Sequence, residues 1–128
     1  MSPAIHHTVI VVKDLDASLR FYKDGIGLEI LNDRQVQGDW PWLFGAPSQS
    51  LRAVFLGDPQ VPDDSAGVLE LNVFDGEVQP GIQSTATTTG FFLLSFFVDV
   101  DTTLHRLSEL NLGGLPKRAD QPGPAGPL

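Results

Sequence analysis

An internal repeat constrains the fold of this chain more than any other feature of its sequence. The segment VKDLDASLRFY resembles the segment VDVDTTLHRL further along the chain. In both copies an aspartate precedes an amphipathic stretch, where its side chain can cap the first turn of a helix. A repeated unit of this kind predicts two related modules. Three pairs match at one constant offset: Asp14 with Asp99, Asp16 with Asp101, and Leu19 with Leu104.

The residues around the first copy predict one complete β-α-β-β-β unit. Ile5 to Val12 is rich in β-branched residues, which favours a strand. Helical spacing of apolar residues predicts a helix over 14–24, stopped by Gly25 and Gly27. Three further strands are expected at 28–36, 50–56 and 68–74, with loops over 37–49 and 58–66.

The second copy predicts only part of a second unit. The very apolar run 91–98 indicates a buried strand, and Asp99 to Leu110 a helix with Val100, Leu104 and Leu107 on one face. One further strand has room around 114–118, and the tail QPGPAGPL should lack regular structure.

The expected fold class is therefore α+β, with paired β-α-β-β-β modules of which the second is incomplete in this chain. The first module covers 1–75, a Gly/Pro/Ser/Thr-rich linker 76–90, and the partial second module with its irregular tail 91–128. Either the chain is truncated or another chain completes the sheet. Because an incomplete sheet leaves an unpaired edge, we expect a homodimer.

Charge and composition exclude several classes of protein. Sixteen acidic and eight basic residues give a net charge of -8, which argues against a nucleic-acid partner. No apolar run approaches the ~20 residues that span a bilayer, so no membrane association is expected. The absence of cysteine excludes thiolate metal sites. The start MSPAIHH lacks the pattern of a secretory signal, and we expect a cytoplasmic protein.

Two side chains are candidate metal ligands. Alternation along a strand places Glu70, Asn72 and Phe74 on one face of 68–74. If the helix covers the opposite face, Glu70 points into a concave face of the sheet, and His7 could point there too. A carboxylate in the run GVLELNVF must be exposed, paired or bound to a cation, because burying it alone is costly. An imidazole and a carboxylate are good ligands for Zn, Ni, Fe or Mn. The alternatives are a hydrogen-bonded structural histidine and a solvated glutamate.

Aromatic residues in the loop 37–49 are candidate ligand-binding residues. Trp40, Trp42 and Phe44 would stack on a planar or apolar molecule if this loop borders a cleft. Alternatively, they pack against the sheet or against a partner subunit. Arg52 could meet an anionic ligand, pair with Glu70 or remain exposed to solvent.

The stretch AIHHTVIVVKDLDASLRFYKDGIGLEI resembles the opening of vicinal oxygen chelate proteins, the superfamily of glyoxalase I, bleomycin-resistance proteins and extradiol dioxygenases. VLELNVFDG is similar to the fourth strand of the same fold. The resemblance covers 5–74 well and 91–114 more loosely. It implies paired modules around a cleft in which the metal enzymes place four ligands, two from each module.

Carried over residue by residue, His7 and Glu70 match the first two ligand positions. The repeat offset carries His7 onto Phe92, and a slip of one residue gives Phe91 or Leu93, none of which is a ligand. The fourth position belongs to the strands missing from the second module. Phe92 is therefore expected to border the ligand cleft instead, together with Asn72 and Phe74.

Three functions are consistent with these residues. The first is a metal-dependent lyase, isomerase or dioxygenase acting on a small oxygenated molecule, with Glu70 as the catalytic residue and the metal stabilising enolate charge. The second is a non-catalytic protein that sequesters a small molecule, as bleomycin-resistance proteins do. The third is a dimerisation module without a ligand.

Overall fold

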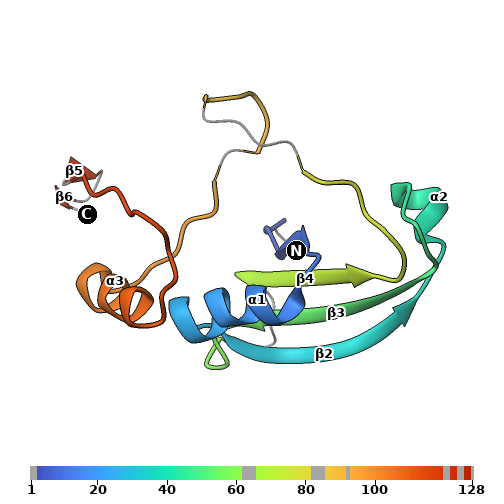
Figure 1. The fold of residues 1–128 in the computed structure, drawn as a ribbon, viewed down its shortest axis with the longest axis horizontal. Helices are drawn as coiled ribbons and strands as arrows, with labels where there is room; N and C mark the ends of the chain where they lie inside the picture. Colours follow the sequence, from blue (N-terminus) through green and yellow to red (C-terminus); the bar gives the residue numbers. More distant parts are fainter. Residues whose placement is uncertain are drawn as a thin grey trace.

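The computed structural model describes residues 3–61, 66–81, 86–91, 93–119, 122–123 and 126–127. Its elements appear in Figure 1 in this order: β1 (His7–Val11), α1 (Leu15–Leu19), the π-helical segment η1 (Arg20–Ile26), β2 (Glu29–Gln37), α2 (Trp40–Phe44), β3 (Ser50–Gly57), β4 (Val68–Phe74), α3 (Val100–Glu109), β5 (Pro122–Gly123) and β6 (Gly126–Pro127).

The first four strands form one mixed sheet in the order β1-β4-β3-β2. β1 runs parallel to β4, with His7 opposite Val68 and Val11 opposite Asn72, whereas the other neighbours are antiparallel. A parallel pair needs a crossover, and α1 with η1 lies on that crossover. The predicted α+β fold and its first β-α-β-β-β unit are confirmed.

One face of the sheet is covered by the first helix. Its N-terminus is capped by Asp14, whose Oδ1 accepts a hydrogen bond from the amide of Ala17 at 3.1 Å, and it ends at Gly27 with a φ of 102°. The predicted helix over 14–24 is confirmed, although its second half is π-helical. Its apolar face packs on the core, whose buried members are Val54, Leu56, Leu69 and Leu71.

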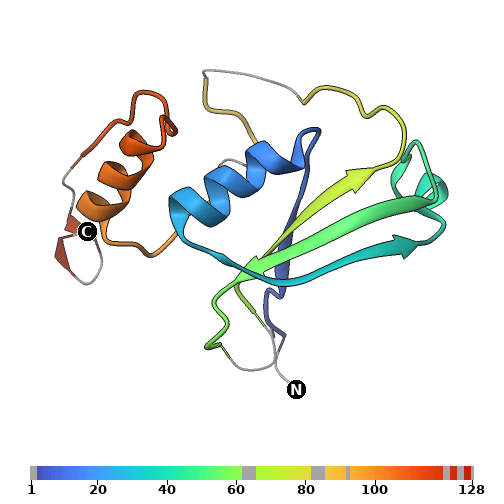
Figure 2. The ribbon, with the colours of Figure 1, turned by 60° about the horizontal axis from the view of Figure 1, so that its bottom comes forward.

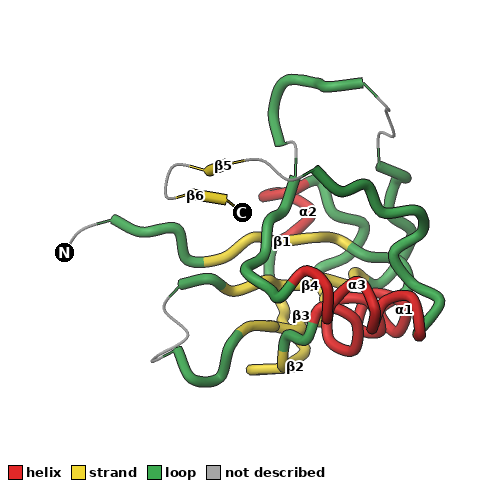
Figure 3. Tube along the Cα trace, turned by 90° about the vertical axis from the view of Figure 1, so that its left-hand side faces the viewer, coloured by secondary structure: helices red, strands yellow, loops and turns green. Residues whose placement is uncertain are grey.

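α3 packs against η1, the second half of the first helix. Figure 2 shows the first helix between α3 and the sheet, and in Figure 3, which is viewed from the side of α3, the two helices overlap on the same side of the sheet. Gly25 permits this approach, because a Cβ there would lie 2.6 Å from Cδ2 of Leu107. Arg106 Nε donates to the Gly25 carbonyl at 2.8 Å, and Arg20 Nη2 donates to the Leu110 carbonyl at 2.7 Å.

The repeat correctly predicted the start of α3. Oδ1 of Asp99 accepts a hydrogen bond from the Thr102 amide at 2.9 Å, and this bond lowers the pKa of Asp99. On the predicted apolar face Leu107 is buried and Leu104 half-buried, while Val100 remains exposed.

The expected strand over 91–98 is wrong. Its described residues, 91 and 93–98, have no strand conformation, and Phe91 and Phe97 are fully exposed. A strand needs a neighbour for its backbone hydrogen bonds, and no described strand lies alongside this run. Phe92 lies outside the described residues.

The expectations for the C-terminal part also need correction. No strand forms over 114–118, which is described throughout. The tail expected to be irregular contains β5 and β6, which pair antiparallel over two residues each. The described chain is thus a single β-α-β-β-β-like module with a four-stranded mixed sheet, followed by α3. Among the described residues, no helix combines the length and apolar composition needed to cross a bilayer.

Candidate functional site

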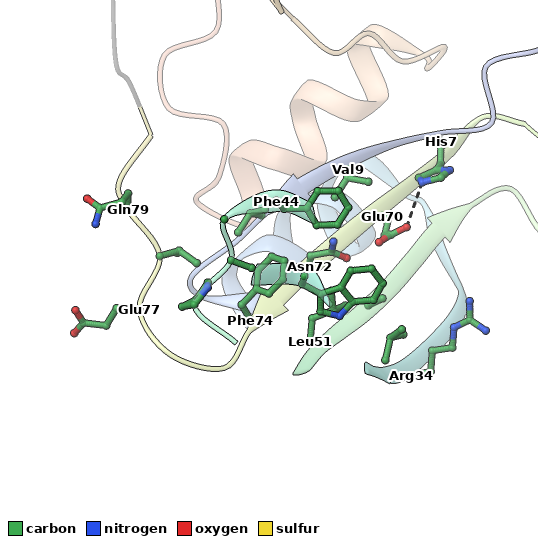
Figure 4. A pocket seen from close by; sticks show the side chains of 18 of the residues that line it. His7, Val9, Arg34, Phe44, Leu51, Glu70, Asn72, Phe74, Glu77 and Gln79 are labelled. Carbon is green, nitrogen blue, oxygen red and sulfur yellow. Dashed lines mark ion pairs between the residues drawn. The ribbon is translucent and has the colours of Figure 1, made fainter. Parts of the chain in front are cut away.

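The sheet face opposite α1 forms one side of a hollow of about 820 Å³ (Figure 4). Its walls come from alternate residues of the four strands, from α2 and the turn after it, and from the segment that follows β4. The lining residues are His7, Val9, Val11, Arg34, Val36, Trp40, Phe44, Gly45, Ala46, Pro47, Leu51, Ala53, Phe55, Glu70, Asn72, Phe74, Glu77, Val78 and Gln79.

His7 and Glu70 meet in this hollow. Nε2 of His7 lies 3.4 Å from Oε1 of Glu70, and the Glu70 side chain is only 13% exposed (Figure 4). Strand alternation explains the convergence, since Val9 and Val11 share the hollow with His7 while Ile10 and Val12 pack toward the core. The expectation that the imidazole and the carboxylate share one concave face agrees with this placement. Their role as metal ligands stays a prediction.

His6 contacts the other nitrogen of the His7 ring. The two Nδ1 atoms lie 2.7 Å apart, so one donates and the other accepts. If His7 donates, its Nε2 lone pair faces the Glu70 carboxylate, and two acceptors at this distance need a cation between them. If His6 donates, His7 Nε2–H can point at Glu70 directly. The two adjacent histidines in the sequence are the signal from which this contact could have been predicted.

The donors present fit two positions of a metal site. Two ligand atoms on one tetrahedral zinc ion lie about 3.3–3.5 Å apart, given metal–ligand bonds of about 2.0–2.2 Å. The observed separation of 3.4 Å falls in this range. Within the described residues, no group of three or more His, Cys, Asp or Glu side chains is placed to hold an ion. His7 and Glu70 would therefore need further ligands from outside this set.

Aromatic rings build one end of the hollow. α2 presents Trp40 and Phe44 on the same side, because residues four apart share a helix face, and their rings stack at 5.7 Å. Trp42 lies between them in sequence, is 79% exposed and does not line the hollow. The expectation of a loop is wrong for Trp40–Phe44, which form α2. The expected contact of Trp42 with a ligand stays a prediction.

Arg52 lies on the other face of the sheet. Along β3, Leu51, Ala53 and Phe55 face the hollow, so the next residue in each case faces away. Arg52 donates to Asp33 from Nε at 2.9 Å and from Nη2 at 2.7 Å, and this pairing lowers the pKa of the Asp33 carboxyl. Of the alternatives stated for Arg52, this placement agrees with exposure to solvent, since the side chain pairs with Asp33 and does not line the hollow.

Arg34 supplies a cation to the hollow instead. Its guanidinium carbon lies 5.5 Å from the centre of the Phe55 ring, a cation–π arrangement. Neither Arg34 nor Phe55 was predicted to line a site, and Glu77 to Gln79 were assigned to a linker. The alternation of β2 and β3 carried the signal for Arg34 and Phe55, but it required knowing which face the helix covers.

Asn72 and Phe74 line the hollow where alternation with Glu70 placed them. Asn72 is 7% exposed. Its Oδ1 and the Nε1 of Trp40 are buried, and neither has a hydrogen-bond partner in the part of the chain that the structure describes. The expected contribution of Phe92 falls outside the described residues.

Comparison with known proteins identifies relatives of this fold and sequence. The chain is 41% identical over 117 residues to the lactoylglutathione lyase-like protein terB of Aspergillus terreus. That match covers 88% of this chain and 59% of terB, so the chain spans about three-fifths of the relative's length.

Two solved structures are similar. A glyoxalase family protein from Bacillus cereus superposes with a TM-score of 0.61 at 23% identity, covering 91% of this chain and 79% of that one, and shows the fold alone. The trypanothione-dependent glyoxalase I of Leishmania major superposes with a TM-score of 0.53 at 28% identity, covering 86% and 68%.

A family model agrees with these relatives. The model described as the Glyoxalase/Bleomycin resistance protein/Dioxygenase superfamily matches residues 4–123, which is nearly the whole sequence. The chain therefore belongs to the glyoxalase/bleomycin resistance protein/dioxygenase superfamily.

Proposed function

We propose that this glyoxalase-like chain belongs to a metal-dependent lyase or isomerase that acts on a small oxygenated molecule. The observation that carries the proposal is the His7–Glu70 pair, 3.4 Å apart in a largely apolar hollow. A divalent ion held there would polarise an oxygen of the substrate and stabilise enolate charge. Zn, Ni, Fe and Mn all suit an imidazole and a carboxylate.

The chain's own residues divide the remaining tasks. Glu70 would accept a proton from a carbon atom next to a carbonyl group of the substrate. His6 would hold the His7 ring in one orientation through their 2.7 Å contact. The apolar walls would pack against an apolar part of the substrate and leave the His7–Glu70 pair as the polar group that receives its oxygen atoms.

The relatives support a lyase over an oxidative enzyme. The Aspergillus relative is called lactoylglutathione lyase-like, and the Leishmania relative is a glyoxalase I. S-lactoylglutathione is therefore the first compound to test with the metal-loaded protein. Consumption of oxygen in the presence of a catechol would instead indicate that the protein is a dioxygenase.

Equilibrium dialysis tests the metal site directly. The protein is dialysed against Zn²⁺, Ni²⁺, Mn²⁺ or Fe²⁺, and bound metal is measured for the wild type and for His7→Ala and Glu70→Gln. We expect each substitution to weaken binding of at least one of these ions by tenfold or more.

His105→Ala and Glu109→Gln provide matched controls. These two residues form an exposed pair on α3 with His105 Nε2 3.0 Å from Glu109 Oε1, away from the hollow. The controls should bind metal like the wild type. Equal metal binding by the wild type and by both site variants would refute the proposal.

A non-catalytic binding protein is the second candidate. It is favoured by the aromatic walls and by the absence, among the described residues, of a group of three side chains placed to hold an ion. In that case the purified protein binds no stoichiometric metal, and Trp40 fluorescence changes when an aromatic compound enters. Trp42→Phe removes the exposed indole, which leaves Trp40 as the reporter, since the chain has two tryptophans.

A further inference from the structure

Arg34 differs from the other arginines of the chain in what its guanidinium group contacts. The chain has five arginines. The other four each donate to an oxygen atom of the protein: Arg20 to the Leu110 carbonyl, Arg106 to the Gly25 carbonyl, Arg52 to Asp33 and Arg118 to Asp101. Arg34 has no such acceptor within the part of the chain that the structure describes, although an arginine is always charged and carries five N–H donors.

The unpaired charge of Arg34 is open to the hollow. Arg34 lines the hollow and is exposed, so a molecule that enters can reach its N–H groups. The preceding residue, Asp33, points to the opposite face of the sheet. Glu70 pairs with His7, and Figure 4 shows Glu77 on the opposite side of the hollow from Arg34. No carboxylate among the described residues therefore neutralises this guanidinium.

Phe55 supports the guanidinium from below. The guanidinium carbon of Arg34 lies 5.5 Å from the centre of the Phe55 ring. A cation is attracted to the face of a ring, and this contact leaves the N–H groups available for an acceptor. Phe55 lies directly opposite Glu70 in the pairing of β3 with β4. The contact therefore holds the positive charge on the same part of the sheet as the His7–Glu70 pair.

The same ring separates Arg34 from His7. In the order β1-β4-β3-β2, the strand of Phe55 lies between the strand of Arg34 and that of Glu70. The ring of His7 is centred 6.5 Å from that of Phe55. Together with the 5.5 Å contact, this places the guanidinium carbon within about 12 Å of the imidazole centre. One small molecule lying over Phe55 can thus reach both groups.

We propose that Arg34 binds a carboxylate group of the ligand of the hollow. The planar guanidinium matches a carboxylate with two parallel N–H···O bonds, which is the strong form of this interaction. A singly charged anion suits the site better than a phosphate, because two glutamates also line the hollow and Arg34 is the only lysine or arginine among its described lining residues. A phosphate monoester carries about 1.5–2 negative charges at neutral pH.

This inference rests on the proposed function for the other end of the ligand. The substrate class is then a carboxylic acid whose reacting oxygen atoms bind at His7 and Glu70. An apolar ring or chain joins these oxygens to the carboxylate and packs on Phe55. Arg34 thereby determines specificity and takes no part in the proton transfer assigned to Glu70.

A matched pair of probes tests the binding of a carboxylate with the full chain. 2-Naphthoate and 2-naphthamide have nearly the same shape, but only the naphthoate is charged. Both are titrated calorimetrically in buffer with a chelator, so that no metal ion can bind the carboxylate. The wild type should bind the naphthoate about tenfold more tightly than the amide, because hydrogen bonds between ionised groups are stronger than those of neutral ones.

Three substitutions identify the source of this preference. Arg34→Gln should abolish the preference for the naphthoate, and Arg34→Lys should keep only part of it, since lysine retains the charge but lacks the planar fork. Arg52→Gln is the matched control, because it removes the same charge from the neighbouring strand on the opposite face of the sheet. It should retain the full preference. Circular dichroism of each variant checks that the fold is intact.

Several results would overturn the inference. These are equal binding of the two probes by the wild type, no measurable binding of the naphthoate, or a preference that persists in Arg34→Gln. An equal loss in Arg52→Gln would show an effect of net charge instead of a contact. Tighter binding of 2-naphthyl phosphate than of 2-naphthoate would contradict the assignment of a carboxylate. Metal binding is scored separately with His7→Ala, so failure of the metal proposal leaves the probe result readable.

Discussion

Single side chains in this protein receive their roles from the face of the strand on which they stand. His7, Glu70 and Asn72 face the hollow because every second side chain of a strand points to the same side of the sheet, and on β1 and β4 these are the residues on the side of the hollow. For the same reason, Arg52 points to the face of the sheet that the first helix covers, where it forms an ion pair with Asp33. The two faces of β1 and β4 could be assigned from the sequence, but those of β3 could not, since both faces of SLRAVFLG contain large apolar residues.

The ion pair between Asp33 and Arg52 predicts a pH effect on stability. Hydrogen bonding to Arg52 holds the pKa of Asp33 below its ordinary value of 3.8. The pair therefore contributes stability above pH ~4, and this contribution disappears as the pH falls through the folded-state pKa. Asp33→Asn should lower the melting temperature slightly at pH 7 and not at all in strong acid, because exposed pairs contribute little.

Glu29→Gln is the matched control for this experiment. It removes the same charge from the same strand, and Glu29 has no ion-pair partner among the residues that the structure describes. Its melting temperature should follow that of the wild type at both pH values. A difference between wild type and Asp33→Asn that persists unchanged in acid would show that the carboxylate form of Asp33 is not what stabilises the fold.

Helices and strands formed largely where local signals placed them. Asp14 and Asp99 cap their helices as the repeat predicted, because a cap depends on residues within one turn. The prediction of a strand over 91–98 was wrong because a strand also depends on a neighbouring strand, which local composition does not reveal. α2 was missed because its Gly and Pro flanks indicated a loop, although Pro is tolerated in the first turn of a helix.

The contact between η1 and α3 predicts an energetic coupling. Gly25→Ala should destabilise the fold by about 1–3 kcal/mol through overpacking against Leu107. Leu107→Ala should cost about 2–5 kcal/mol by leaving a cavity. In the double variant the new methyl group occupies part of that cavity, so the loss should be clearly smaller than the sum. Urea unfolding measures all three, and strict additivity would contradict this packing.

At the scale of the whole molecule, the segment that precedes α3 exposes large apolar side chains to solvent. Phe91, Leu93 and Phe97 are largely exposed, and β1 forms one edge of the sheet. Extended apolar patches mark interaction surfaces, and an open edge can accept another strand. The family and its fold could be predicted from the first module, whereas this surface became visible only when 91–98 proved not to be a strand.

We therefore expect a homodimer. Sedimentation velocity of the wild type should show a species of two chains, and replacing Phe91 and Phe97 together by aspartate should shift it toward one chain. The control is Trp42→Asp, which alters an exposed aromatic on α2 instead. A wild type that sediments as one chain at every concentration would contradict the expectation.

X-ray absorption spectroscopy at the metal edge of the zinc-loaded protein tests the metal proposal most directly. We predict nitrogen and oxygen neighbours at about 2.0–2.2 Å, with an imidazole contribution that disappears in His7→Ala and persists in His105→Ala. A spectrum that is identical in the wild type, His7→Ala and Glu70→Gln would contradict the assignment of this pair as metal ligands.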